Sequence, residues 1–123
     1  MGANPINLAV RFILEIAALA AIGQWAWQLA EKTWLRVLFT IAAVVLSAAV
    51  WGTFAVPNDP SRSGHAPIPT LGWVRLLLEL AFFFFAVWSF FATGGKIWGT
   101  VLAVVTLVHY LVSYDRVIWL LKQ

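Results

Sequence analysis

Four long apolar stretches follow one another along the chain, separated by short polar segments. A helix needs about 20 mostly apolar residues to cross a bilayer, and each stretch reaches that length. The length of these apolar stretches predicts helices, and each stretch contains few charged residues. We expect four membrane-spanning helices over about residues 5–29, 33–54, 70–93 and 97–121.

The segments between the stretches are typical of helix ends. Residues whose side chains can cap a helix N-terminus stand just before or at the start of three of the stretches: Asn4, Thr33 and Thr70. The Gly94-Gly95 pair predicts the end of the third helix. Residues 55–69 hold four of the chain's five prolines, so this segment is predicted to be a long loop outside the hydrocarbon.

Composition supports a membrane protein and narrows the chemistry. Of the 123 residues, 63% are hydrophobic and 11% charged, against roughly 45–50% and 25% in a soluble domain. The eight Lys and Arg are spread along the chain, which argues against a nucleic-acid-binding face. Without cysteine there is no thiolate nucleophile and no cysteine-based metal site. No enzyme signature stands out, and we expect neither catalysis nor a metal or cofactor.

An internal repeat links the first and third stretches. The segment Val10–Ala17, VRFILEIA, returns 64 residues later as VRLLLELA at Val74–Ala81. Further matches at the same offset pair Lys32 with Lys96 and Trp34 with Trp98. A two-helix unit returns the chain to its starting side, so two such units must be parallel. The expected fold is therefore an all-α integral membrane protein, a bundle of four transmembrane helices built from two parallel helical hairpins.

Each copy of the repeat carries an Arg four residues before a Glu, deep in an apolar helix. Charges at such a depth are costly, so we expect Arg11 to pair with Glu79 and Arg75 with Glu15 across the two copies. Two further charged residues belong to the same half of the bilayer, Asp115 and Arg116. The cluster is either a binding site for a solute or proton, or an ionic clasp that fixes the helices in register.

Other polar and aromatic residues extend this picture. His109 is the one histidine in a predicted span; it either relays protons or hydrogen-bonds across helices. Trp51, Gly52 and Phe54 are expected to shape the mouth of the bundle below the long loop. Gly52 would let a neighbouring helix approach closely, and Trp51 would turn its N–H toward polar groups.

Charges and tryptophans also suggest how the chain lies in the membrane. The eight tryptophans fall near the predicted helix ends, as expected for belts at the two interfaces. The side of the termini and the long loop carries more basic residues, namely Arg11, Arg62, Arg75, Arg116 and Lys122 against Lys32, Arg36 and Lys96. The positive-inside rule then predicts cytoplasmic termini.

One set of residues resembles a known family: Asn7, Arg11, Leu14 and Glu15, then Trp51-Gly52-Thr53-Phe54 with Pro57, then Arg75, Leu78 and Glu79. This pattern is similar to the YrdB-like family of small bacterial four-span membrane proteins, a domain of unknown function. The resemblance implies a bacterial origin, location in the cytoplasmic membrane and a four-helix membrane fold, and it implies no activity. The chain departs from the family in its longer, Pro-rich loop and at His109, where an amide is common.

The function best predicted is binding or passage of a small amphipathic or ionic solute beside the Arg/Glu cluster. The small size of the chain then implies a homodimer in the lipid bilayer, with a ligand of unknown identity. The alternative is a structural or assembly subunit of a membrane complex, whose charges only hold its helices together.

Overall fold

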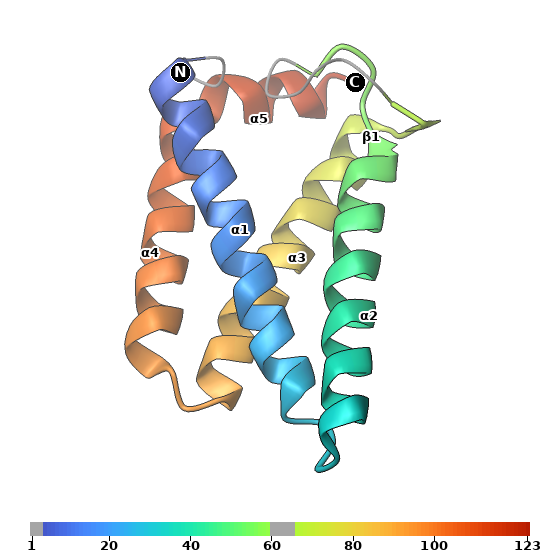
Figure 1. The fold of residues 1–123 in the computed structure, drawn as a ribbon. Helices are drawn as coiled ribbons and strands as arrows, with labels where there is room; N and C mark the ends of the chain where they lie inside the picture. Colours follow the sequence, from blue (N-terminus) through green and yellow to red (C-terminus); the bar gives the residue numbers. More distant parts are fainter. Residues whose placement is uncertain (1–3, 60–65) are drawn as a thin grey trace.

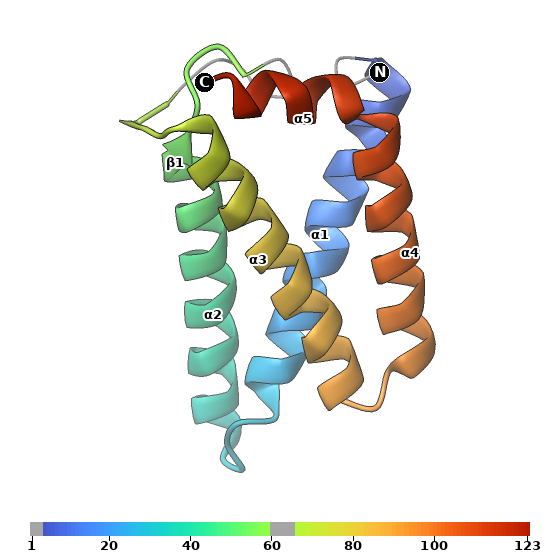
Figure 2. The ribbon, with the colours of Figure 1, turned by 180° about the vertical axis from the view of Figure 1, so that it is seen from behind.

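The computed structural model of the protein describes residues 4–59 and 66–123. Arg62 and the middle of the long loop lie outside this range. The described residues form helices joined by short connections, with one pair of two-residue strands (Figures 1 and 2). In chain order the elements are α1 (Pro5–Trp27), α2 (Thr33–Thr53), β1 (Phe54–Ala55), β2 (Ile68–Pro69), α3 (Gly72–Ala92), α4 (Lys96–Val112) and α5 (Tyr114–Leu121).

Two predicted helix ends are confirmed. The Asn4 side chain accepts the backbone N–H of Ile6 at 2.9 Å, and Pro5 occupies the first helical position. That N–H has no partner within the helix, which explains why Asn is favoured there. At the other end, α3 stops at Ala92 and Gly94 takes a φ of 83°, a left-handed conformation that glycine adopts without strain.

The two threonine caps were predicted wrongly. Helix α2 begins at Thr33 itself, after Lys32, and α3 begins at Gly72, after Leu71. The Thr70 hydroxyl instead donates to the carbonyl of Ile68 at 3.0 Å. The backbone N–H of Thr70 donates to Ala55, extending the short parallel pairing of β1 with β2. The chain therefore enters α3 from a strand, and this strand holds Thr70 away from the cap position.

The helices alternate in direction, and α1 and α3 run the same way (Figures 1 and 2). Both ends of the described chain lie at the end of the molecule that carries α5. Helix α1 packs against α2, α3 and α4, whereas α2 and α3 touch only slightly. Helix α2 is thus held at the side of the molecule, and Trp51 is its buried residue.

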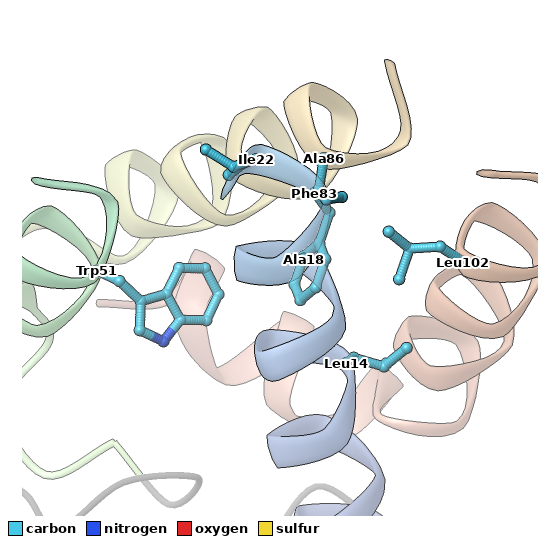
Figure 3. Packing of buried hydrophobic residues seen from close by; sticks show 8 residues of the cluster. Leu14, Ala18, Ile22, Trp51, Phe83, Ala86 and Leu102 are labelled. Carbon is cyan, nitrogen blue, oxygen red and sulfur yellow. The ribbon is translucent and has the colours of Figure 1, made fainter. Parts of the chain in front are cut away.

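The apolar core lies where α1 crosses α3. Ala18 and Ala86, with no exposed surface, allow these two helices to approach closely. In Figure 3, Leu14 of α1 and Leu102 of α4 point toward one another on one side of α1, and Trp51 of α2 lies on the other. Small residues at a helix crossing are what close packing within a membrane requires.

The fourth predicted helix is not continuous. Three helices, α1, α2 and α3, are each long and apolar enough to cross a membrane, and the pair α4–α5 makes a fourth if it counts as one span. That pair bends by 71° at a break around Ser113, and α5 runs across the end of the bundle (Figure 1). The expected single helix over residues 97–121 is therefore wrong, because the chain turns where polar Ser113 and Arg116 enter the bundle.

A glycine that permits close approach does exist, but it is not the predicted one. A Cβ placed on Gly52 would meet no atom within 4 Å, so its predicted packing role is wrong. A Cβ on Gly72 would overlap the carbonyl of Leu120. Gly72 is buried at the start of α3, directly against α5. The end of the bundle is therefore closed by backbone-to-backbone contact between α3 and α5.

We expect Gly72→Ala to lower the thermal stability of the purified protein in detergent, because α5 would have to move away from α3. A change that overpacks a core typically costs about 1–3 kcal/mol. The matched control is Gly52→Ala, which fills open space and favours the helix by up to about 1 kcal/mol. Equal melting temperatures for the two variants would contradict this view of the α3–α5 contact.

Candidate functional site

A network of charged side chains fills the end of the bundle that carries α5. Arg11 and Glu15 come from one face of α1, and Arg75 and Glu79 from one face of α3, because residues four apart share a helix face. Two more charges complete the network, Arg116 on α5 and Asp59 after β1. All are buried except Glu15, whose side chain is 24% exposed. Three positive charges thus face three negative ones.

Glu79 is the centre of this network and is fully buried. Its Oε1 accepts the Tyr110 hydroxyl at 2.7 Å and Arg116 Nη1 at 2.8 Å. Its Oε2 accepts Arg75 Nε at 2.8 Å and Arg116 Nη2 at 2.7 Å. A carboxylate offers about four lone-pair positions, so these four donors saturate it.

Arg11 forms the predicted contact between α1 and α3, although in an incomplete way. Its Nη2 lies 3.0 Å from Glu79 Oε1, and its Nε lies 3.3 Å from Glu15 Oε1. Both terminal nitrogens are nevertheless buried without a hydrogen-bond acceptor among the described residues. The reason follows from Glu79: its lone pairs already serve other donors. Arg11 is therefore paired in charge and unsatisfied in hydrogen bonding.

Arg75 does not complete the symmetric ring that the repeat predicted. It pairs with Glu79 on its own helix, and its Nη1 donates to the carbonyls of Trp51 and Phe54, at 2.6 Å each. These carbonyls lie at the C-terminal end of α2 and just beyond it, where carbonyls have no partner within the helix. Arg75 also lies 4.4 Å from the centre of the Trp51 ring. It ties the end of α2 to α3.

Arg116 is joined to the connection that follows β1. Its Nε and Nη2 donate to the two oxygens of Asp59, at 3.0 Å and 2.6 Å. A turn positions this acid: Asn58 has a φ of 64°, and the Asp59 N–H donates to the Val56 carbonyl. Asn tolerates this left-handed conformation. Asp115, an expected member of the cluster, is exposed.

A second polar group joins α1 to α4 and its break. Asn7 donates through Nδ2 to the Ser113 hydroxyl at 2.6 Å, and its Oδ1 lies 3.1 Å from His109 Nδ1. This network assigns the proton of the histidine ring to Nδ1. His109 therefore makes the hydrogen bond across helices that was one of its two predicted roles; proton relay stays a prediction. One turn deeper, the Thr106 hydroxyl is buried without a hydrogen-bond partner among the described residues.

The predicted mouth residues have separate roles. The Trp51 indole N–H donates to Glu15 Oε1 at 3.1 Å, which confirms its predicted orientation toward polar groups. Its ring also lies 5.3 Å from the Arg11 guanidinium carbon. Phe54 contributes its carbonyl, to Arg75. Trp51 therefore joins α2 to the charged network, and its ring lies against both arginines of the repeat.

Sequence reasoning missed three members of this site: Asn7, Asp59 and Tyr110. Tyr110 follows His109 on the inward face of α4, and Asn7 precedes Arg11 by one turn, so helical spacing carried a signal for both. Asp59 had no such signal. It lies in a Pro-rich loop, and its partner is 57 residues away in the chain.

Comparisons with known proteins identify the family of the chain. Residues 9–107 match the family described as "Protein of unknown function (DUF2568)". The chain belongs to this family. It is also similar to a protein of Bacillus subtilis (strain 168) named "Uncharacterized protein YrdB", with 38% identity over 120 residues, 98% of this chain and 97% of that one. No solved structure matches the chain.

Replacing Glu79 should destabilise the protein far more than replacing Glu15. Glu79→Gln removes the negative charge and one of the two acceptor oxygens that Arg75 and Arg116 share, and breaking a buried ion pair costs about 3–5 kcal/mol. Glu15→Gln affects a partly exposed group and should cost about 1 kcal/mol. Unfolding by added sodium dodecyl sulfate in mixed micelles measures both variants, and a larger loss for Glu15→Gln would contradict the central position of Glu79.

Asp59→Asn should loosen α5 while α1 to α3 remain protected. The amide cannot accept both Arg116 donors, so α5 loses its link to the β1 connection. Hydrogen exchange by mass spectrometry should show faster exchange in peptides from 114–123 and unchanged exchange in those from 72–92. Asp115→Asn, at an exposed neighbouring position, is the comparison and should have a smaller effect. A larger increase in exchange for Asp115→Asn than for Asp59→Asn would mean that Asp115, and not Asp59, holds Arg116 in place.

Proposed function

We propose that this chain is a four-span membrane protein of two parallel helical hairpins that binds a small amphipathic or ionic solute beside Arg11. The 64-residue repeat and the common direction of α1 and α3 support the hairpin arrangement, with the bent pair α4–α5 as the fourth span. Its place is the cytoplasmic membrane of a bacterium, with both termini in the cytoplasm, and a homodimer is its working form.

The observation that carries the binding function is the unsatisfied guanidinium of Arg11. Its two terminal nitrogens are buried and lack an acceptor in the described part of the chain. Each buried donor left without a partner costs about 1–3 kcal/mol. A solute that brings an acceptor removes this cost, and a hydrogen bond to a charged donor is stronger than a neutral one.

Helix register places a second unsatisfied group near Arg11. Asn7 with His109 and Leu14 with Leu102 are facing pairs of the antiparallel helices α1 and α4. Arg11 and Thr106 lie between these two pairs on their respective helices. The Thr106 hydroxyl and the Arg11 guanidinium thus belong to one level of the bundle, where a small solute with donor and acceptor atoms has two groups to bind.

The network divides into two parts with different roles. Arg75, Glu79, Arg116 and Asp59 are joined by ion pairs and form a clasp that closes the end of the bundle. Arg11 and Glu15 form the part that meets the solute. An ion-paired clasp next to Arg11 keeps that arginine in a fixed position, as a binding group requires.

The test is whether small molecules co-purify with the protein through Arg11. The variant carries Arg11→Gln together with Glu15→Gln, so one charge of each sign is removed and the Glu79 clasp is left intact. Protein is purified in mild detergent, and the molecules released on denaturation are measured by mass spectrometry. At least one amphipathic or ionic species should be enriched tenfold or more in the native protein over the variant.

Two controls make this result decisive. Unfolding in mixed micelles must show that the double variant keeps its fold. The matched charge-neutral control is Glu31→Gln with Lys32→Gln, at exposed positions in the α1–α2 turn, and it should retain the species. If the native protein and the double variant release the same molecules in the same amounts, the solute site is wrong.

The rival function, a structural or assembly subunit, also has an observation in its favour. No residue in the most apolar part of α2 is buried, so this helix presents its side chains outward. An outward apolar helix faces lipid or a partner protein. If the chain is such a subunit, the double variant at Arg11 and Glu15 should still assemble with its partner protein and co-purify with it, as the native chain does.

A further inference from the structure

A groove runs along the side of the molecule where α2 and α3 separate. It has a volume of about 370 Å³ and is open to the side. Its lining is almost wholly apolar, from α1, α2 and α3: Ile22, Leu46, Ser47, Val50, Trp51, Leu78, Ala81, Phe82 and Phe85. The lining segment of α3, from Leu78 to Phe85, spans about 10 Å along the helix axis. The groove has the size of a binding site for one short hydrocarbon chain.

Trp51 connects this groove to the charged network. It lies at the groove's end nearest α5, since it is the last lining residue of α2 and Leu78 is the first of α3. The same indole donates to Glu15 and lies within 5.3 Å of Arg11 and 4.4 Å of Arg75. The ring therefore separates a lipid-facing groove from the buried guanidinium of Arg11, whose terminal nitrogens have no hydrogen-bond partner among the described residues.

We propose that the groove and Arg11 form one site for a single-chain amphiphile with a carboxylate headgroup, and that Trp51 is the gate between its two parts. This inference rests on the proposed function and names its ligand class. The hydrocarbon chain lies between Leu78 and Phe85, reached sideways from the bilayer. The indole turns aside, and the carboxylate accepts hydrogen bonds from the two terminal nitrogens of Arg11.

Charge and geometry favour this class of ligand. A carboxylate matches the two parallel donors of a guanidinium, and each buried methylene adds about 0.8 kcal/mol of apolar burial. The ligand adds one negative charge to a network of three positive and three negative groups. Glu15 is the partly exposed acid of that network, so it is the group placed to move outward when the ligand binds.

A second groove provides an internal comparison. It lies between α1 and α2 on another face, with a volume of about 580 Å³, and Gly23, Thr40 and Val44 are among its lining residues. Its lining contains no member of the charged network. Lipid chains that merely cover an apolar surface should occupy both grooves alike. A hydrocarbon chain whose headgroup is recognised by Arg11 should prefer the first groove.

The experiment measures binding of radiolabelled decanoic acid to the full chain in dodecyl maltoside by scintillation proximity. Saturable binding of about one decanoate per chain is expected for the native protein. Ala81→Phe fills the first groove and should weaken binding tenfold or more. Ala20→Phe fills the second groove and should leave it unchanged. The Arg11→Gln with Glu15→Gln variant should weaken it tenfold or more, and methyl decanoate should compete poorly.

The outcomes separate this inference from the proposed function. If Ala81→Phe binds decanoate as the native protein does, or if methyl decanoate competes as well as the acid, the groove or the carboxylate class is wrong. If only the Arg11 and Glu15 variant loses binding, the solute site stands and the groove does not. If only Ala81→Phe loses binding, the groove holds a chain without Arg11, and the solute site is wrong too. Trp51→Ala, which removes the gate, should speed decanoate association severalfold; an unchanged rate overturns the gating role.

Discussion

The end of this bundle depends on one buried carboxylate. Glu79 receives donors from its own helix, from α4 and from α5, and it lies against Arg11 of α1. Burying a charge in a membrane is costly, so such a group is stable only where its partners are all in place. Arg116 reaches Glu79 because the chain bends by 71° near Ser113. The bend, the position of α5 and the anchoring of the β1 connection through Asp59 all follow from satisfying this acid.

The repeat explains both what the sequence predicted and where the prediction failed. It placed Arg11 opposite Glu79, and that contact is present. It also predicted a matching contact for Arg75, which assumes that the two halves have the same surroundings. At the 64-residue offset, however, Tyr110 and Arg116 correspond to Leu46 and Gly52. The first half of the repeat therefore carries no second copy of Tyr110 and Arg116, two of the donors that bind Glu79.

Local signals predicted the local features. Asn4, Pro5 and the Gly94-Gly95 pair mark helix ends correctly because each acts within one turn of its own position. The break at Ser113 was missed because hydropathy averages over a window and α5 is apolar enough to continue the stretch. Asp59 was missed for a related reason. Its burial is decided by a partner far along the chain, and a Pro-rich composition indicates a loop without telling where the loop folds back.

The two halves of the network also differ in how completely their donors find acceptors. Consistency between local and global requirements is usual in a folded chain, and departures from it tend to occur at functional sites. Arg11 shows such a departure, because its charge is balanced while its two terminal nitrogens have no hydrogen-bond partner in the described part of the chain. The Glu79 clasp does not need Arg11 as a hydrogen-bond donor, so the clasp stays complete whichever acceptor Arg11 meets. The network therefore has one half built around the saturated carboxylate of Glu79 and one half in which Arg11 is balanced in charge alone.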